Sequence, residues 1–332
     1  MSMTIKDLVE AYTTDRVSTY HALRYHTRKN AASILKRLVA SHGHIELSTI
    51  KRRELTEWYL DWSAGGKLSM AHSFIAQIRT MMGFGASMLE HPECERISMV
   101  LHRMRFQHGP PRSVHMTADQ ANAIRDVARA HFGWPSIALA QAIQFELLLR
   151  QGDVIGSWVP ENEPGESDVR RDGEKWGRGL RWEEIDENMI LRHVTSKRQK
   201  LLEIDLKLAP MLVSELEMEG FDGTRASLPA FGPMLICEIT GQPWKATEFR
   251  RKWRLVANKA EVPKAIKSMD SRAGGITEAT EAGADLEHVK HAATHSDIAQ
   301  TQRYSRNATD KIASVQNTRI QHRAKKKMIH GD

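Results

Sequence analysis

The segment from residue 107 to residue 114, QHGPPRSV, limits most strongly how this chain can fold. It contains a glycine and two adjacent prolines, Pro110 and Pro111. Proline lacks the backbone N–H that a helix interior needs, and it also disfavours the helical conformation of the residue before it. Residues 107–116 are therefore predicted to be a linker. Since a domain usually takes about 100 to 200 residues, the 332-residue chain is predicted to form two domains, 1–106 and 117–332.

Apolar residues recur at helical spacing in five stretches of the first domain. Thr4 and Asp7 form a capping pattern ahead of the first stretch. The stripes are Ile5, Leu8, Val9 and Tyr12; Ala31, Ile34, Leu35 and Leu38; Leu55, Trp58, Tyr59 and Trp62; Ala71, Phe74, Ile75, Ile78, Met81 and Met82; and Ile97, Val100, Leu101 and Met104. Glycine-containing breaks separate them, and alternating strand patterns are lacking, so residues 1–106 are predicted to form a small helical bundle.

The second domain mixes helical and strand patterns. Thr117 and Gln120 form a capping box at its first helix. The apolar stretch 135–159 is predicted to be a buried helix pair, and the charged stretch 161–179 an exposed loop. Strands are expected over 181–186, 189–194 and 201–206, with a turn at 195–200; helices are expected over 209–219, after a cap at Thr247, and over 308–327. The fold class is therefore mainly α with a small antiparallel β-sheet.

The composition of the chain indicates what kind of partner and location to expect. The chain carries 48 Lys and Arg against 41 Asp and Glu, a formal net charge of +7, so a polyanion such as nucleic acid is a plausible partner. Two isolated cysteines, Cys94 and Cys237, indicate neither a disulfide framework nor a zinc ribbon. The polar start and the lack of a long apolar run predict neither a signal peptide nor a membrane span, and a cytoplasmic location is expected.

Residues 267–306 contain side chains suited to gripping a phosphodiester and attacking it. Arg272 offers a guanidinium, the triplet Thr294-His295-Ser296 an imidazole, and Tyr304 a phenol. Their order and spacing resemble the C-terminal catalytic motif of the tyrosine recombinases, the phage-integrase family. Met269 stands where that motif usually has its first histidine.

The resemblance extends upstream and implies further site residues. The family's first arginine box matches LRQGD at 149–153, which makes Arg150 the first arginine and Asp153 its buttressing carboxylate. From the residues alone, Arg150 could equally form a salt bridge with Asp153 or Glu146. The family carries a catalytic lysine on a hairpin; Lys197 is the best match, and Lys200 is the second choice.

The resemblance implies a SAM-like, core-binding helical domain at 1–106 and an α+β catalytic domain at 117–332. It implies a site-specific DNA recombinase that cuts and rejoins double-stranded DNA attachment sites through a 3′-phosphotyrosyl intermediate, without metal, ATP or another cofactor. A homotetramer on two DNA sites, an accessory DNA-bending or directionality protein, and association with the nucleoid are expected with it. Candidate DNA-binding residues are Arg28, Lys36, Arg52, Arg79 and Arg251, although each could instead belong to a solvated helix face.

Several alternatives remain open at this point. Because a thioether cannot transfer protons, Met269 leaves three alternatives: a slow enzyme, one that uses a substitute such as Asp270, or a DNA-binding regulator on the same scaffold. An active enzyme is favoured, since the nucleophile, both arginines and a lysine candidate are present. A type IB topoisomerase would share the chemistry, and a metal-dependent transposase would need a carboxylate cluster. His288, His291 and His295 would share one helical face and could bind zinc if one helix carried all three.

Overall fold

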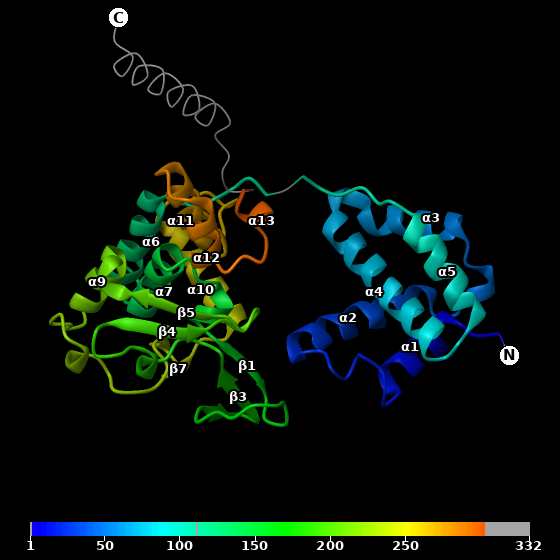
Figure 1. The fold of residues 1–332 in the computed structure, drawn as a ribbon, viewed down its shortest axis with the longest axis horizontal. Helices are drawn as coiled ribbons and strands as arrows, with labels where there is room; N and C mark the ends of the chain where they lie inside the picture. The colour runs from blue at the N-terminus through cyan, green and yellow to red at the C-terminus, as the bar shows by residue number, and fades with distance from the viewer. Residues whose placement is uncertain (1, 111, 303–332) are drawn as a thin grey trace, which may run out of the picture. The chain divides into compact units, whose positions relative to one another are not determined.

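The computed structural model describes residues 2–110 and 112–302 of the chain. The chain divides into two compact units, Met1–Arg112 and Ser113–Asp332, and the division falls inside the segment predicted as a linker. Figure 1 labels the elements of both units. Among the described residues, every helix is too short or too polar to cross a membrane.

The first unit is a bundle of helices. They are α1 (Ile5–Thr14), α2 (Tyr25–His42), α3 (Arg52–Ser63), α4 (Leu68–Ser87) and α5 (Pro92–Arg103). The predicted cap is present: the Thr4 side chain accepts from the Asp7 N–H, and the Asp7 carboxylate accepts from the Thr4 N–H. Pro92 occupies the first turn of α5, where a missing N–H costs nothing.

Helix α4 lies at the centre of this unit and packs against α1, α2, α3 and α5. Its predicted apolar stripe is buried, with Phe74, Ile75, Ile78 and Met81 each at most 2% exposed. Gly85 lets α5 approach, since a Cβ there would lie 2.4 Å from the Cys94 sulfur. The helical bundle predicted for this part of the chain is therefore confirmed.

The second unit is a helical core edged by small antiparallel sheets. Its helices are α6 (Ala118–Ala130), α7 (Pro135–Glu146), α8 (Gln151–Val154), α9 (Pro210–Glu217), α10 (Ala246–Lys259), α11 (Asp270–Glu281), α12 (Leu286–Ala292) and α13 (Ile298–Gln302). Its strands are β1 (Ser157–Pro160), β2 (Arg170–Arg171), β3 (Glu174–Gly177), β4 (Ile190–Val194), β5 (Leu201–Asp205), β6 (Ile236–Cys237) and β7 (Gln242–Pro243). The expected fold class, mainly α with small antiparallel sheets, is confirmed.

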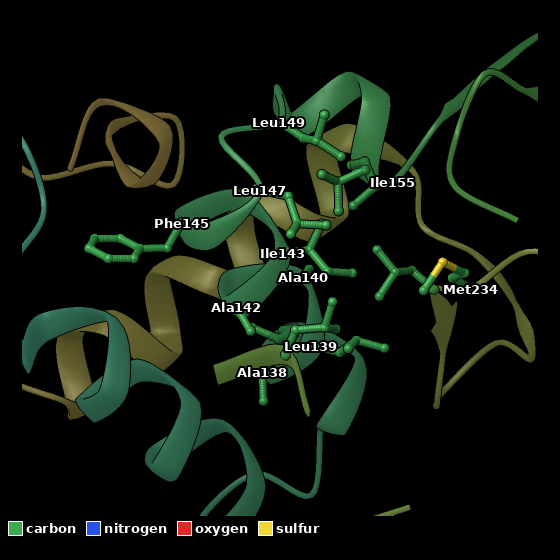
Figure 2. Packing of buried hydrophobic residues seen from close by; sticks show 14 of the residues in the cluster. Ala138, Leu139, Ala140, Ala142, Ile143, Phe145, Leu147, Leu149, Ile155 and Met234 are labelled. Carbon is green, nitrogen blue, oxygen red and sulfur yellow. The ribbon is translucent and has the colours of Figure 1, made fainter. Parts of the chain in front are cut away.

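Helix α7 is the core element of the second unit. Every residue from Ser136 to Phe145 is buried, and α6, α9 and α11 all pack against it. Figure 2 shows its side chains Ala138, Leu139, Ala142, Ile143 and Phe145 within the hydrophobic cluster, with Leu147, Leu149 and Ile155 from the segment that follows. The elements that carry the candidate site are thus anchored on one buried helix.

The stretch 135–159 differs from the predicted helix pair. After α7 the chain forms only the single turn α8 and then strand β1. Leu148 and Gly156 adopt left-handed backbone conformations, with φ of 53° and 70°, and both interrupt a helix. A side chain at Gly156 would strike the Trp176 ring, because its Cβ would lie 2.4 Å from Nε1. Close packing of this tryptophan therefore fixes where the second helix ends.

The exposed loop predicted over 161–179 is wrong for part of its length. Strands β2 and β3 form an antiparallel sheet with β1 in the order β1-β3-β2, and Trp176 is buried with its Nε1 donating to the Ile155 carbonyl at 2.9 Å. Lys175 is also buried, and its ammonium donates to the Glu163 and Gly165 carbonyls. Most residues around this short sheet are charged, so its strands lack the alternating apolar pattern by which a strand is predicted.

Two further predictions need correction. The strand expected over 181–186 is a 3₁₀ turn at Trp182–Glu184, because the buried Arg225 guanidinium takes the carbonyls of Trp182 and Ile185 away from strand pairing. Thr247 lies inside α10, which begins at Ala246, rather than capping it. The hairpin of β4 and β5 forms as predicted, with Leu191 opposite Ile204. The helix expected over 308–327 lies outside the described residues.

Candidate active site

Helix α11 reaches the core because two consecutive glycines let it lie against other backbone segments. A Cβ at Gly274 would lie 2.1 Å from the Met116 carbonyl oxygen, and one at Gly275 would lie 2.1 Å from that of Phe145. These distances are too short for any side chain. The close approach places Arg272, one turn earlier, inside the unit with only 9% of its surface exposed.

Arg272 connects the two chain segments that follow α7 and α12. One terminal nitrogen donates to the Leu148 carbonyl at 2.7 Å, and the other donates to the Ala293 carbonyl. A guanidinium is planar and carries its donors in a fixed fork, so the two bonds set the orientation of the group. The predicted second arginine is therefore held from both sides.

Arg150 lies at the N-terminus of α8 and reaches the same segment after α12. Its terminal nitrogen donates to the Thr294 hydroxyl at 3.0 Å and lies 3.9 Å from the Asp153 carboxylate. The Arg150 side chain is 26% exposed, whereas Asp153 is fully buried. The structure thus brings Arg150 and Arg272 to neighbouring residues, Thr294 and Ala293.

The turn between β4 and β5 is joined to this cluster at two points. The Ser196 N–H donates to the Asp153 carboxylate at 2.7 Å, and the Arg198 guanidinium donates to the Ser296 hydroxyl at 2.8 Å. Lys197 and Lys200 both lie exposed in this turn. The hairpin therefore lies beside the segment that carries Arg150 and beside the segment after α12, while the choice between the two lysines stays open.

His295 is buried beside three positive charges. It is 6% exposed, and its Nδ1 lies 3.0 Å from the Thr301 hydroxyl. Burial, followed by the charges of Arg272, Arg150 and Arg198, lowers the pKa of His295 to about 4. The imidazole is consequently neutral at pH 7 and can donate from one ring nitrogen while it accepts at the other.

Met269 and Asp270 stand at the start of α11. Met269 is 62% exposed, so its thioether lies at the surface where the motif would present an imidazole. Asp270 is 3% exposed and accepts from the Lys267 N–H at 2.8 Å, an arrangement that caps the turn before the helix. Tyr304, the predicted nucleophile, lies outside the described residues.

Two buried glutamines on α7, Gln141 and Gln144, were not singled out from the sequence. The Gln141 amide donates to the Ser271 hydroxyl at 2.7 Å and accepts from the Trp253 indole at 3.0 Å. Ser268 donates to Gln144 at 3.4 Å and accepts from Gln151 at 3.1 Å. The sequence offered one signal for these contacts: both glutamines lie within a continuous apolar stretch, and a buried amide needs hydrogen-bond partners. They hold the first turn of α11, and with it Arg272.

The candidate DNA-binding residues divide by their contacts. Lys36 and Arg52 are exposed on α2 and α3. Arg28 donates to the Leu23 carbonyl at 2.9 Å, and Arg79 donates to the Leu101 carbonyl at 3.0 Å. Arg251 is paired with Glu248 at 2.6 Å. Arg79 and Arg251 are exposed as well, so exposure does not separate the candidates, and the role of all five stays a prediction.

The three histidines of the alternative zinc site do not share one helical face. Helix α12 ends at Ala292, so it carries His288 and His291 but not His295. His288 and His291 are exposed, whereas His295 is buried. Within residues 2–110 and 112–302, no group of three or more His, Cys, Asp or Glu side chains could hold a metal ion.

Helices α6, α7 and α11 around a buried arginine, a hairpin beside it and a preceding helical bundle constitute the tyrosine-recombinase fold. Solved integrases share it. A λ integrase dimer bound to a COC′ core site superposes with a TM-score of 0.67 at 13% identity, covering 92% of this chain and 96% of that one. The Tn1549 transposon integrase in complex with circular intermediate DNA gives 0.63 at 13% identity, covering 95% and 99%. A λ integrase tetramer bound to a Holliday junction gives 0.65 at 14% identity, covering 89% and 78%.

Comparison at the level of sequence gives a different result. Models of protein families do not match the chain, and curated protein sequences do not match it either. The likeness therefore resides in the fold, and the functional assignment has to be argued from the chain's own side chains.

Proposed function

We propose that this chain is a site-specific DNA recombinase that cuts and rejoins DNA with Tyr304 as the nucleophile. The observation that carries the proposal is the meeting of Arg150 and Arg272 at one short segment, Ala293 to His295, beside the β4–β5 turn. Side chains from four separate segments of the chain would not converge there for stability alone, since burying like charges together is costly.

The chemistry follows from the charges at this place. Arg150 and Arg272 would hold the non-bridging oxygens of a DNA phosphate and neutralise the charge that grows as phosphorus becomes five-coordinate. The Tyr304 phenol would release its proton to water, which the positive charges of the site favour. Its oxygen would form a bond to phosphorus while the bond from phosphorus to the 5′ oxygen breaks. Lys197 would donate a proton to that departing oxygen, and neutral His295 would donate a hydrogen bond to the phosphate.

One structural contact and one fact of the sequence support Tyr304 in this role. Thr301 is buried and bonded to His295, so α13 is fixed at the candidate site. Tyr304 follows the last described residue, Gln302, after a single intervening position in the sequence. Its covalent link to the 3′ phosphate would retain the energy of the broken bond, so rejoining would need neither a metal nor ATP.

Double-stranded DNA is the partner that this proposal requires. The net charge of +7 favours it, and the integrases with this fold were solved on DNA. In the proposal, residues 1–106 form the core-binding domain, 107–116 the linker and 117–332 the catalytic domain. Four protomers would act on two DNA sites, and an accessory protein would set the direction.

A second candidate function, a DNA-binding regulator without chemistry, is favoured by Met269. Its exposed thioether cannot transfer protons, and loss of general acid–base help lowers rates by about 10²- to 10⁴-fold. Asp270 is a poor substitute, because its carboxylate is buried and bonded to Lys267.

A covalent trapping assay separates these functions. Purified full-length protein is incubated with nicked suicide duplexes drawn from the DNA that flanks its own gene. A protein–DNA adduct that survives denaturation, and that is absent with Tyr304→Phe, supports the recombinase. Tight, salt-sensitive binding of a particular duplex without any adduct supports the regulator. Relaxation of plasmids that lack a specific site would instead indicate topoisomerase chemistry.

A further inference from the structure

The end of α12 carries a residue that its backbone does not favour. The Thr294 N–H donates to the His291 carbonyl at 2.9 Å, and the His295 N–H donates to the Lys290 carbonyl at 3.0 Å. This pair of bonds is the Schellman motif, which places a left-handed residue just beyond the helix cap. Thr294 occupies that position with φ of 51°, although glycine is the residue that adopts it without strain.

Helix α11 of the same unit shows the unstrained solution. Gly283 occupies the equivalent position with φ of 86°. Its N–H donates to the Thr280 carbonyl at 3.3 Å, and the Ala284 N–H donates to the Ala279 carbonyl at 3.0 Å. Two helices therefore end in the same motif, one with glycine and one with a β-branched residue, for which a left-handed backbone is an outlier.

The difference between the two ends is the contact that the side chain makes. Gly283 is exposed, whereas Thr294 is 1% exposed and its hydroxyl accepts from the Arg150 guanidinium at 3.0 Å. A glycine would form the same turn but would offer Arg150 no acceptor. Among the described residues, Asp153 is the ion-pair partner of Arg150, at the longer distance of 3.9 Å. The hydroxyl is thus the nearer of these two groups that orient it.

The same turn also receives the second arginine. Arg272 donates to the carbonyl of Ala293, the residue directly before Thr294, so the backbone of the turn holds one guanidinium and the threonine side chain holds the other. Displacement of Thr294 would alter the spacing of both positive groups. Strained backbone persists where the surrounding contacts fix it, and it commonly marks functional sites.

We infer that Thr294 is a positioning residue: its hydroxyl fixes the Arg150 guanidinium against the turn that also holds Arg272, and this contact is why a strained threonine stands where glycine would fold more easily. The inference rests on the proposed recombinase chemistry. Thr294 itself touches no reacting atom; it acts through Arg150.

Three substitutions separate the hydroxyl from the strain. Thr294→Val keeps the branched shape and removes the acceptor, Thr294→Ser keeps the acceptor, and Thr294→Gly removes both acceptor and strain. Single-turnover adduct formation on the nicked duplex should fall about 10- to 100-fold with Val and with Gly, the size expected for losing a hydrogen bond to a charged group, and should stay near wild type with Ser.

Thermal unfolding distinguishes a positioning role from a purely structural one, because a structural role would lower the melting temperature and the reaction rate together. Thr294→Gly should melt close to wild type, because relief of strain offsets the lost bond, so its slower reaction would reflect orientation rather than unfolding. As a matched control for strain, Gly283→Thr should lower the melting temperature. In an Arg150→Ala background, Thr294→Val should cause no additional loss of adduct formation.

The inference is overturned if Thr294→Gly reacts as fast as wild type, or if Val and Ser variants behave alike. If wild-type protein forms no adduct on any duplex, the proposed function fails instead. In that case the Thr294–Arg150 contact is judged by a double-mutant cycle in melting temperature, where additive effects of Thr294→Val and Arg150→Ala would overturn it and a coupled effect would support it.

Discussion

The interior of the candidate site is closely packed, whereas its surface part is an exposed turn with few contacts to the rest. In the interior, α11 lies on the Met116 backbone through Gly274 and on the α7 backbone through Gly275, and Arg272 is bonded to two carbonyls. At the surface, Lys197 lies exposed in a turn that is joined to the rest through Ser196 and Arg198. The contrast teaches that Arg272 is fixed by the core, whereas the group proposed to deliver a proton lies at the surface. Substitutions on the two sides should therefore separate stability from activity.

The largest effect on stability is expected at the contact between α11 and α7. Gly275→Ala should lower the free energy of unfolding by about 1 to 3 kcal/mol, the usual cost of overpacking, because the new Cβ would lie 2.1 Å from the Phe145 carbonyl. Gly152→Ala is the matched control, since open space surrounds a Cβ there. Chemical denaturation of both variants measures the difference in their free energies of unfolding. Equal values would show that α11 does not pack closely against the α7 backbone.

A smaller effect is expected from the titration of His295. Its pKa is about 4 in the folded protein and about 6.5 in an unfolded chain, so below pH 6.5 the unfolded state binds a proton that the folded state does not. Above pH 6.5 the imidazole is neutral in both states, so it does not change the free energy of unfolding. As the pH falls from 6.5 towards 4, proton binding favours the unfolded state and the free energy of unfolding decreases. Between pH 7 and pH 5, wild type should lose about 1 to 2 kcal/mol more than His295→Gln. Denaturation at both pH values tests this, and parallel losses would place the histidine in solvent.

The smallest effect on stability is expected in the β4–β5 turn. Lys197→Ala should change the free energy of unfolding by less than about 0.5 kcal/mol, as is usual for a surface substitution. The same change should slow strand cleavage by about 10²- to 10⁴-fold if Lys197 is the general acid. Lys200→Ala is the control from the same turn. A larger loss of rate with Lys200→Ala would assign the role to that lysine.

Helical periodicity predicted the parts of the fold in which burial is one-sided. The stripe Phe74, Ile75, Ile78 and Met81 is buried as its spacing indicated, because each helix of the bundle covers one apolar face. The β4–β5 hairpin also formed where the alternation of Leu202, Ile204 and Leu206 placed it, although its third member lies just beyond the strand. Local pattern was sufficient in these regions.

Sequence pattern failed where distant contacts decide the structure. Strand β3 buries the adjacent residues Lys175 and Trp176, which breaks the alternation of a one-faced strand; the lysine is satisfied by loop carbonyls and the tryptophan by Ile155. For the site, the motif indicated Arg150, Arg272 and His295, but neither the glutamines of α7 nor the arginine–hydroxyl contact of Thr294 could be read from spacing, since each depends on residues more than a hundred positions away.

The carboxylate of Asp153 has one consequence beyond holding Arg150. One of its oxygens accepts from the Ser196 backbone, and the other lies 3.9 Å from the guanidinium. A single side chain therefore sets the separation between the Arg150 guanidinium and the β4–β5 turn. The turn is tethered through a main-chain N–H, which every residue except proline supplies. Side chains along the hairpin can therefore be exchanged while this contact to Asp153 is kept.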